Sequence, residues 1–225
     1  MMFYPAYLDI KGRECVVVGG GRVALRKVRG LLECNASVSV VSPILHAELA
    51  ALHAQGKIIW HEKKYSKGDI VGAFLVIAAT NDQGAQEEVF HDARQLNTLL
   101  NVADVPEKCN FILPARVQRG SLSISVSTGG KSPALAKMLR KKLEQEFDEN
   151  YTVLNDIMGI VRPEVIQTNL PQQENERMFN AILGSDILKH IEEGNSGAVI
   201  DIVNHCIGKQ LTVNTVEAIQ QRLQS

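Results

Sequence analysis

The sequence has few aromatic residues, no long hydrophobic run and almost no net charge. Its formal net charge is −1, so no overall field attracts it to nucleic acid or to an anionic membrane, and any basic site is local. Aromatic residues make up 5% of the chain, too few to suggest stacking platforms for single-stranded nucleic acid. Apolar runs such as residues 73–79 are far shorter than the roughly 20 residues of a membrane span. We therefore expect no membrane and no nucleic-acid partner.

Signatures of disulfide bonding, metal binding and secretion are also missing. The four cysteines are scattered and have no zinc-ligand spacing: Cys15, Cys34, Cys109 and Cys206. The six histidines lack the spacing of a preformed metal site. Residues 1–13 lack the basic start and long apolar run of a secretory signal. We expect no metal site and a cytoplasmic location.

The 225 residues suffice for two domains. From residue 14 to about 103, β-branched runs alternate with helical patterns, as is typical of βαβ units and a parallel sheet. The predicted strands are Glu14–Val18, Ser37–Val41, Lys57–His61, Phe74–Ala79 and Thr98–Ala103; the predicted helices are Arg22–Glu33, Leu45–Gln55 and Asp82–Leu96. This order predicts an α/β fold, a Rossmann-type doubly wound parallel sheet, over residues 1–112.

After residue 110 the pattern changes. Residues 115–118 and 122–127 flank a turn, and the second run alternates apolar and polar residues, which predicts an antiparallel hairpin. Ser132-Pro133 is typical of a helix start, and apolar residues follow every fourth position from Leu135. Residues 150–225 show only helical patterns, with interruptions expected at Pro163, Pro171, Gly184 and Gly194-Asn195. We therefore expect a small β-containing region over residues 113–149 and an all-helical C-terminal domain over residues 150–225.

A glycine-rich motif separates the first predicted strand from the first helix. Gly19 permits a tight turn, Gly21 lets the backbone approach a pyrophosphate, and Ala24 allows the helix to pack closely on the strand. The helix N-terminus then faces the anion. Glycines also end strands for purely structural reasons, but a strand before and a helix after favour dinucleotide binding. The cofactor contacts expected here are Gly19, Gly20, Gly21, Arg22 and Val23.

Rossmann sites commonly have an acid at the end of the second strand, where it holds the adenosine ribose. Here Ser42, Pro43 and Ile44 follow the strand, so that acid is missing, and no arginine is placed for a 2′-phosphate. The choice between NAD and NADP does not follow from this position. We expect Ser42 and the next two residues to contact the ribose through a hydroxyl and free backbone.

Two further segments follow predicted strands at the edge where Rossmann ligands bind. Thr80 and Asn81 follow the fourth strand and are placed to contact a cofactor, although capping of the next helix explains them about as well. Asp104 follows the fifth strand, where a carboxylate can accept a proton from a substrate. On position alone, an aspartate in a turn before proline is a slightly better explanation.

Paired glycines lead into the helix that starts after Ser132. The segment predicts a concave set of backbone amides at a helix N-terminus, to which Lys131 adds a positive charge. Because such a surface suits an acidic ligand, we expect these residues to bind substrate: Thr128, Gly129, Gly130, Lys131 and Ser132. The charge run Arg140 to Lys142 is more simply a solvated helix face.

Four blocks together resemble the precorrin-2 dehydrogenase and sirohydrochlorin ferrochelatase family, which includes the N-terminal region of siroheme synthases. They are residues 18–27 (VGGGRVALRK), 101–104 (NVAD), 111–115 (FILPA) and 127–136 (STGGKSPALA), and the last is the most specific. The resemblance covers residues 1 to about 148. It implies a Rossmann domain, a dimerisation region at 113–149, a helical tail and a homodimer.

The resemblance also implies an activity. Members of this family oxidise precorrin-2 to sirohydrochlorin with NAD, in siroheme biosynthesis, and some also insert Fe²⁺. Asp104 matches the family's functional aspartate, which makes a role in proton removal the favoured interpretation. Precorrin-2 is rich in carboxylates, which suits residues 128–132. No methyltransferase region is expected here. Two alternatives stay open, namely a regulatory module that only senses NAD, and an enzyme that only chelates metal.

Overall fold

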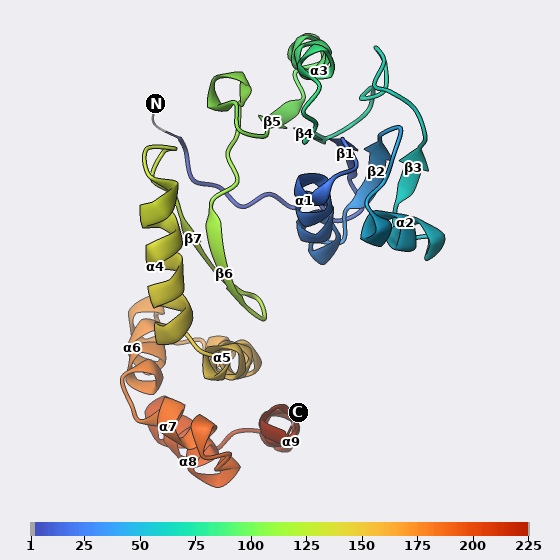
Figure 1. The fold of residues 1–225 in the computed structure, drawn as a ribbon. Helices are drawn as coiled ribbons and strands as arrows, with labels where there is room; N and C mark the ends of the chain where they lie inside the picture. The colour runs from blue at the N-terminus through green and yellow to red at the C-terminus, as the bar shows by residue number, and fades with distance from the viewer. Residues whose placement is uncertain (1–2, 225) are drawn as a thin grey trace. The chain divides into compact units, whose positions relative to one another are not determined.

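The computed structural model describes residues 3–224, which form two compact units, one ending at Leu113 and one beginning at Pro114. The first unit is a five-stranded parallel sheet in the order β3-β2-β1-β4-β5 (Figure 1). Its strands are β1 Glu14–Val18, β2 Ser37–Val41, β3 Ile59–His61, β4 Leu75–Ala78 and β5 Leu99–Val102. Its helices are α1 Arg22–Glu33, α2 Ala47–Ala54, α3 Gln83–Gln95 and the short 3₁₀ helix η1 Pro106–Lys108. The doubly wound fold expected from the sequence is confirmed.

Each face of this sheet has its own apolar core, because successive side chains of a strand point to opposite faces. Cys15 and Val17 of β1 pack with residues of α1 and α2. Val16 and Val18 pack with residues of α3 and with Tyr65 of the β3–β4 loop. The strand order reverses between β1 and β4, so the carboxyl ends of these two strands mark the crevice in which such sheets bind ligands.

The expected element boundaries differ from the observed ones mainly around α2. His46 is the residue before the helix, and its ring nitrogen accepts a hydrogen bond from the Glu48 amide at 3.3 Å. At the other end, the Lys57 amide donates to the Leu52 carbonyl at 3.0 Å and so belongs to the helix end. The strand predicted from Lys57 therefore begins at Ile59.

The second unit contains the hairpin β6 Ala115–Arg119 and β7 Leu122–Val126, in which Val117 pairs with Ile124, followed by helices. These are α4 Pro133–Glu146, α5 Asn150–Ile166, α6 Gln172–Leu183, α7 Ile187–Glu192, α8 Ser196–Ile207 and α9 Val213–Gln224. The hairpin and the interruptions at Pro171, Gly184 and Asn195 are confirmed. In α4 only Ala136 is buried, so the apolar stripe that begins at Leu135 stays partly exposed.

The interruption expected at Pro163 is wrong, because α5 continues through it to Ile166. A proline removes one backbone hydrogen bond, and here it does so in the last turn, where few such bonds remain to be lost. Val161 and Val165 on either side are fully buried and hold the helix against its neighbours. The Gln167 amide still donates to the Pro163 carbonyl at 2.9 Å.

Glu164, the next residue, is 4% exposed and joins α5 to the start of α9. One carboxylate oxygen of Glu164 accepts a hydrogen bond from Lys209 Nζ at 2.8 Å. The other accepts three: from the Thr212 amide at 3.0 Å, from the Thr212 hydroxyl at 2.6 Å and from the Thr215 hydroxyl at 2.8 Å. These donors lower the pKa of Glu164 from 4.5 to about 2, with Lys209 the largest cause. The buried carboxylate thus caps the N-terminus of α9.

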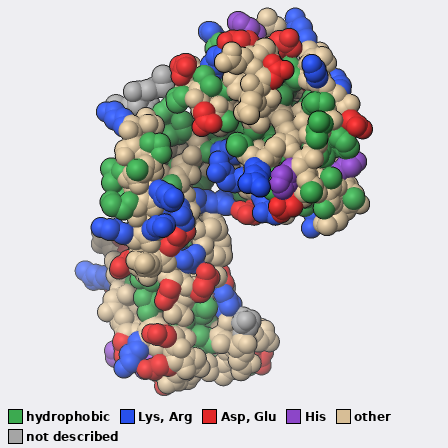
Figure 2. Space-filling view, viewed as in Figure 1, with side chains coloured by type: hydrophobic (Ala, Val, Ile, Leu, Met, Phe, Trp, Pro, Cys, Tyr) green, Lys and Arg blue, Asp and Glu red, His purple; other side chains and the backbone are tan. Residues whose placement is uncertain are grey.

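Both signs of charge occur on the visible surface of each unit (Figure 2). Within residues 3–224, no helix is long and apolar enough to cross a membrane. The same residues contain no group of three or more histidine, cysteine or acidic side chains that could hold a metal ion.

Candidate functional site

The turn after β1 is built on two glycines that have no room for a side chain. Gly19 has a φ of +119°, and a Cβ there would lie 2.3 Å from the Ala79 carbonyl oxygen at the end of β4. A Cβ on Gly20 would lie 2.0 Å from the Ile44 carbonyl oxygen. Both glycines are therefore required because the segments after β2 and β4 pack directly against the turn.

Gly21 differs, since a Cβ on it would meet nothing within 4 Å. It is the N-cap of α1 and offers no side chain to the first helical amides. No side chain caps those amides, which carry the partial positive charge of the helix N-terminus beside the open space at Gly21. A pyrophosphate fits here, because the backbone can approach it and several N–H groups face it.

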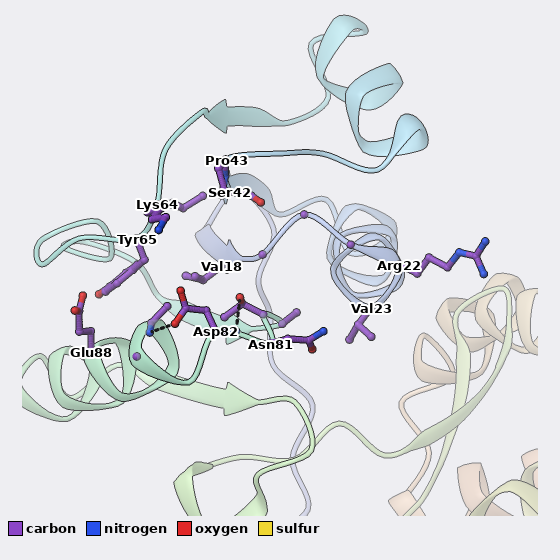
Figure 3. Close-up of a pocket in the computed structure, with 18 residues that line it drawn as sticks. Val18, Arg22, Val23, Ser42, Pro43, Lys64, Tyr65, Asn81, Asp82 and Glu88 are labelled. Atoms are coloured by element: carbon purple, nitrogen blue, oxygen red, sulfur yellow. Dashed lines mark hydrogen bonds between the residues drawn. The ribbon is translucent and has the colours of Figure 1, made fainter.

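A cavity of about 490 Å³ opens at this turn, within the size range of ligand pockets (Figure 3). Nine of the ten residues expected to contact a cofactor line it: Gly19, Gly20, Gly21, Arg22, Val23, Ser42, Pro43, Thr80 and Asn81. Ile44 does not line it. Its side chain is 76% exposed, and its carbonyl instead accepts the Ser42 hydroxyl at 2.7 Å.

Two roles were considered for the segment after β4, namely contact with a cofactor and capping of the next helix, and the structure assigns them to different residues. Asp82 is the N-cap of α3, and its carboxylate accepts a hydrogen bond from the Ala85 amide at 3.1 Å. The Thr80 hydroxyl accepts the Asp82 amide at 3.2 Å, while the Asn81 side chain bonds to no other described residue. Capping therefore does not occupy Asn81, which lies at the cavity beside Val23 (Figure 3).

Sequence reasoning missed several cavity residues, namely Val18, Val41, Lys64, Tyr65, Ala79, Asp82, Gly84, Ala85 and Glu88. Lys64 and Tyr65 belong to the irregular β3–β4 loop. Tyr65 is buried, and its hydroxyl donates to Asp92 of α3 at 2.8 Å. Burial, followed by this hydrogen bond, raises the pKa of Tyr65 far above its usual value. No periodicity marks such a loop. The capping of α3 considered for Thr80 and Asn81 is done instead by Asp82.

Asp104 lies just after β5, is exposed and has a φ of +62°. Cys109 connects the loop that carries Asp104 to β5. Its sulfur accepts a hydrogen bond from the Val102 amide at 3.2 Å and donates one to the Val105 carbonyl at 3.4 Å. Burial raises the pKa of the Cys109 thiol, so this cysteine is structural rather than reactive. Asp104 thus follows the carboxyl end of β5, at the same edge of the sheet as the cavity, but it is not among the residues that line the cavity.

Lys27 of α1 is a half-buried cation near this loop. Burial is the largest cause that lowers its pKa, followed by Arg26, while the charges of Asp104 and Cys109 act in the opposite direction. Lys27 therefore lies within electrostatic reach of Asp104.

The expected anion site at residues 128–132 has fewer free amides than the sequence implied. Gly129 and Gly130 both have positive φ, and the turn binds to itself: the Lys131 amide donates to the Thr128 carbonyl and the Ser132 amide to the Thr128 hydroxyl, each at 3.1 Å. The Gly129 amide donates to Ser127, and the Ser132 hydroxyl caps Leu135 of α4. Among the described residues, the amides of Gly130 and Ala134 keep no acceptor, and Lys131 is exposed.

Comparisons with known proteins agree with this geometry. A family model described as NAD(P)-binding matches residues 6–115, and a model described as the central part of a sirohaem biosynthesis protein matches residues 119–146. The first unit is therefore an NAD(P)-binding domain, which supports a nicotinamide cofactor.

Similar proteins are known by sequence and by structure. The siroheme synthase of Nitrosococcus oceani is 38% identical over 86% of this chain and 42% of its own length. That of Mannheimia succiniciproducens is 39% identical over 81% of this chain and 38% of its own length, so the chain spans about two fifths of these relatives. The solved structure of SirC, a precorrin-2 dehydrogenase, covers 99% of both chains with a TM-score of 0.67 and 27% identity. The chain is therefore similar, over most of its length, to about two fifths of the length of siroheme synthases in sequence and to a precorrin-2 dehydrogenase in fold.

Proposed function

We propose that this protein oxidises precorrin-2 to sirohydrochlorin in siroheme biosynthesis, with NAD⁺ as the hydride acceptor. The observation that carries the proposal is the cavity at the glycine turn, in which Gly19 and Gly20 are required by packing and Gly21 faces open space. Its relatives are siroheme synthases and a precorrin-2 dehydrogenase. The reaction removes one hydride and one proton from the substrate, so the protein needs a base as well as a cofactor site.

The residues of the cavity bind and orient the cofactor. The first amides of α1 would hold the pyrophosphate, and Ser42 and Pro43 would border the adenosine ribose. Asn81, which does not cap α3, would contact the nicotinamide half of the dinucleotide. When bound, NAD⁺ supplies the hydride acceptor for the reaction.

Asp104 is the base in this proposal. Its exposed carboxylate at the end of β5 would accept the proton that leaves precorrin-2 while the hydride departs.

Substrate carboxylates would be held at the start of α4. The amides of Gly130 and Ala134 and the ammonium group of Lys131 remain available there for an acidic ligand. Thr128, Gly129 and Ser132 contribute by shaping this turn, since their own hydrogen bonds fix its conformation.

We also propose that the protein is a cytoplasmic homodimer paired through residues 113–149. Leu135 and Met138 of α4 are 43% and 46% exposed, and a second copy would cover them. All four cysteines are free thiols, in keeping with a reducing compartment. Light scattering of the purified protein measures the oligomer, and a monomeric mass would refute the pairing.

The oxidation is tested by incubating the purified protein with precorrin-2, with and without NAD⁺, and following the absorbance of sirohydrochlorin. Product that forms only with NAD⁺ supports the proposal; no NAD⁺-dependent product refutes it. Asp104→Asn should lower kcat about a hundredfold or more while NAD⁺ binding is unchanged. Glu107→Gln, an exposed acid of the same loop, is the matched control and should leave kcat unchanged. Equal effects of the two substitutions would assign Asp104 to the turn alone.

A further inference from the structure

The end of the cavity next to β2 holds a lysine from another segment and lacks the acid that dinucleotide sites specific for NAD usually have after this strand. That acid accepts hydrogen bonds from the adenosine ribose hydroxyls and repels a 2′-phosphate. Here the position after β2 belongs to Ser42, which is 7% exposed and whose hydroxyl donates to the Ile44 carbonyl at 2.7 Å. No carboxylate therefore stands at this place to exclude a 2′-phosphate.

Lys64 reaches the same place from the β3–β4 loop. The Ser42 amide donates to the His61 carbonyl at 3.2 Å, so the chain that follows β3 starts beside the chain that follows β2. Lys64 lines the cavity together with Ser42 and Pro43, and Figure 3 shows it next to them. It is exposed, and its ammonium group bonds to no other described residue, so its charge is available to a ligand.

Hydrogen bonds hold both sequence neighbours of Lys64 in place. The neighbouring Lys63 is occupied, because its ammonium group donates to Ser66 at 3.0 Å and to Asp69 at 2.6 Å. Tyr65 on the other side is anchored by its buried hydrogen bond to Asp92. Of these two adjacent lysines, one stabilises the loop and the other faces the cavity.

Two acids also line the cavity, and neither replaces the missing one. Asp82 is occupied as the N-cap of α3. Glu88 extends from α3 on the far side of Tyr65 from Ser42 (Figure 3). Lys64 is therefore the charged residue that lies next to Ser42 and Pro43, whereas Asp82 caps α3 and Glu88 belongs to it (Figure 3).

We infer that Lys64 makes this site accept the 2′-phosphate of NADP⁺, so that the protein binds NADP⁺ about as tightly as NAD⁺. A phosphate dianion beside an unpaired ammonium group gains attraction that a ribose hydroxyl does not, and this gain offsets the phosphate's loss of hydration. The inference rests on the proposed dinucleotide site, and it concerns which cofactors enter that site rather than the substrate.

The test is calorimetric titration of the full chain with NAD⁺ and NADP⁺, and with AMP and adenosine 2′,5′-bisphosphate as probes of the adenosine half alone. We expect the two wild-type Kd values for the dinucleotides to agree within about fivefold. Lys64→Ala should raise the Kd of NADP⁺ and of the bisphosphate about tenfold and change those of NAD⁺ and AMP less than about twofold. Lys64→Arg should preserve NADP⁺ binding, and Lys64→Glu should weaken it further.

Lys67→Ala is the matched control, because Lys67 is an exposed lysine of the same loop that does not line the cavity. It should leave every Kd unchanged. Wild-type protein that binds NAD⁺ but not NADP⁺, or a Lys64→Ala variant with unchanged NADP⁺ affinity, would overturn the inference and leave the dehydrogenase proposal standing. Wild-type protein that binds neither cofactor would refute the proposed function itself.

Discussion

Replacing Glu164 by glutamine should destabilise the helical unit through one buried carboxylate. The pKa of Glu164 falls from 4.5 to about 2 in the folded protein, and a shift of this size corresponds to about 3 kcal/mol of stability at neutral pH. The side chain of Lys209, its ion-pair partner, is 37% exposed, so solvent screens part of that attraction. Glutamine keeps the shape but offers one acceptor oxygen to donors that surround both carboxylate oxygens. We expect a loss of about 2 kcal/mol.

The pH dependence follows from the direction of the shift. Because the folded-state pKa is lowered, the contribution of Glu164 is complete above about pH 4.5 and is lost as the pH falls through about 2. The difference between wild type and Glu164→Gln should therefore shrink between these two values. A difference that stays constant over this range would contradict the assignment of the effect to the charge.

Urea unfolding followed by two probes locates the effect. Far-UV circular dichroism reports mainly the second unit, which contains most of the helices, and the fluorescence of Trp60, the single tryptophan, reports the first. Glu164→Gln should lower the midpoint seen by circular dichroism and leave the Trp60 transition in place. Glu217→Gln, an exposed glutamate of α9, is the control. A change at Glu164 no larger than this control, about 0.5 kcal/mol, would refute the reasoning.

Three further substitutions test the site. Gly19→Ala should abolish NAD⁺ binding in calorimetry, because its Cβ would lie 2.3 Å from the Ala79 carbonyl oxygen at a φ of +119°; unchanged affinity would show that the turn can relax. Tyr65→Phe should cost about 1–3 kcal/mol in urea unfolding followed by Trp60, since it leaves the buried carboxylate of Asp92 without its donor. Lys131→Gln should raise KM for precorrin-2 several-fold at constant kcat, whereas an altered kcat with unchanged KM would remove Lys131 from carboxylate binding.

The doubly wound fold was predictable because its information is local and periodic. Four of the five strands in the first unit begin and end within one residue of the predicted positions, since β-branched runs between glycines and helical patterns define them. Pro163 shows the limit of such rules. Proline disfavours a helix interior, but the burial of Val161 and Val165 outweighs one missing hydrogen bond at the helix end.

The site was only partly predictable, for a reason visible in Lys64 and Tyr65. Both residues lie in an irregular loop. The pairing of β3 with β2 brings this loop to the cavity, and the hydrogen bond from the Tyr65 hydroxyl to Asp92, far away in the sequence, fixes it there. No local pattern encodes either contact. In the same way, the sequence predicted donors at residues 128–132, whereas folding uses three of those amides within the turn itself.

The sequence by itself determined the parallel sheet, the glycine turn and the strand ends at which Thr80, Asn81 and Asp104 stand, because strand direction and turn chemistry are properties of short segments. Only the tertiary structure decided which neighbours make Gly19 and Gly20 irreplaceable, which acid caps α3, and which of two adjacent lysines faces the cavity. Those outcomes depend on contacts between segments distant in the chain, whose geometry is fixed only when the whole unit packs.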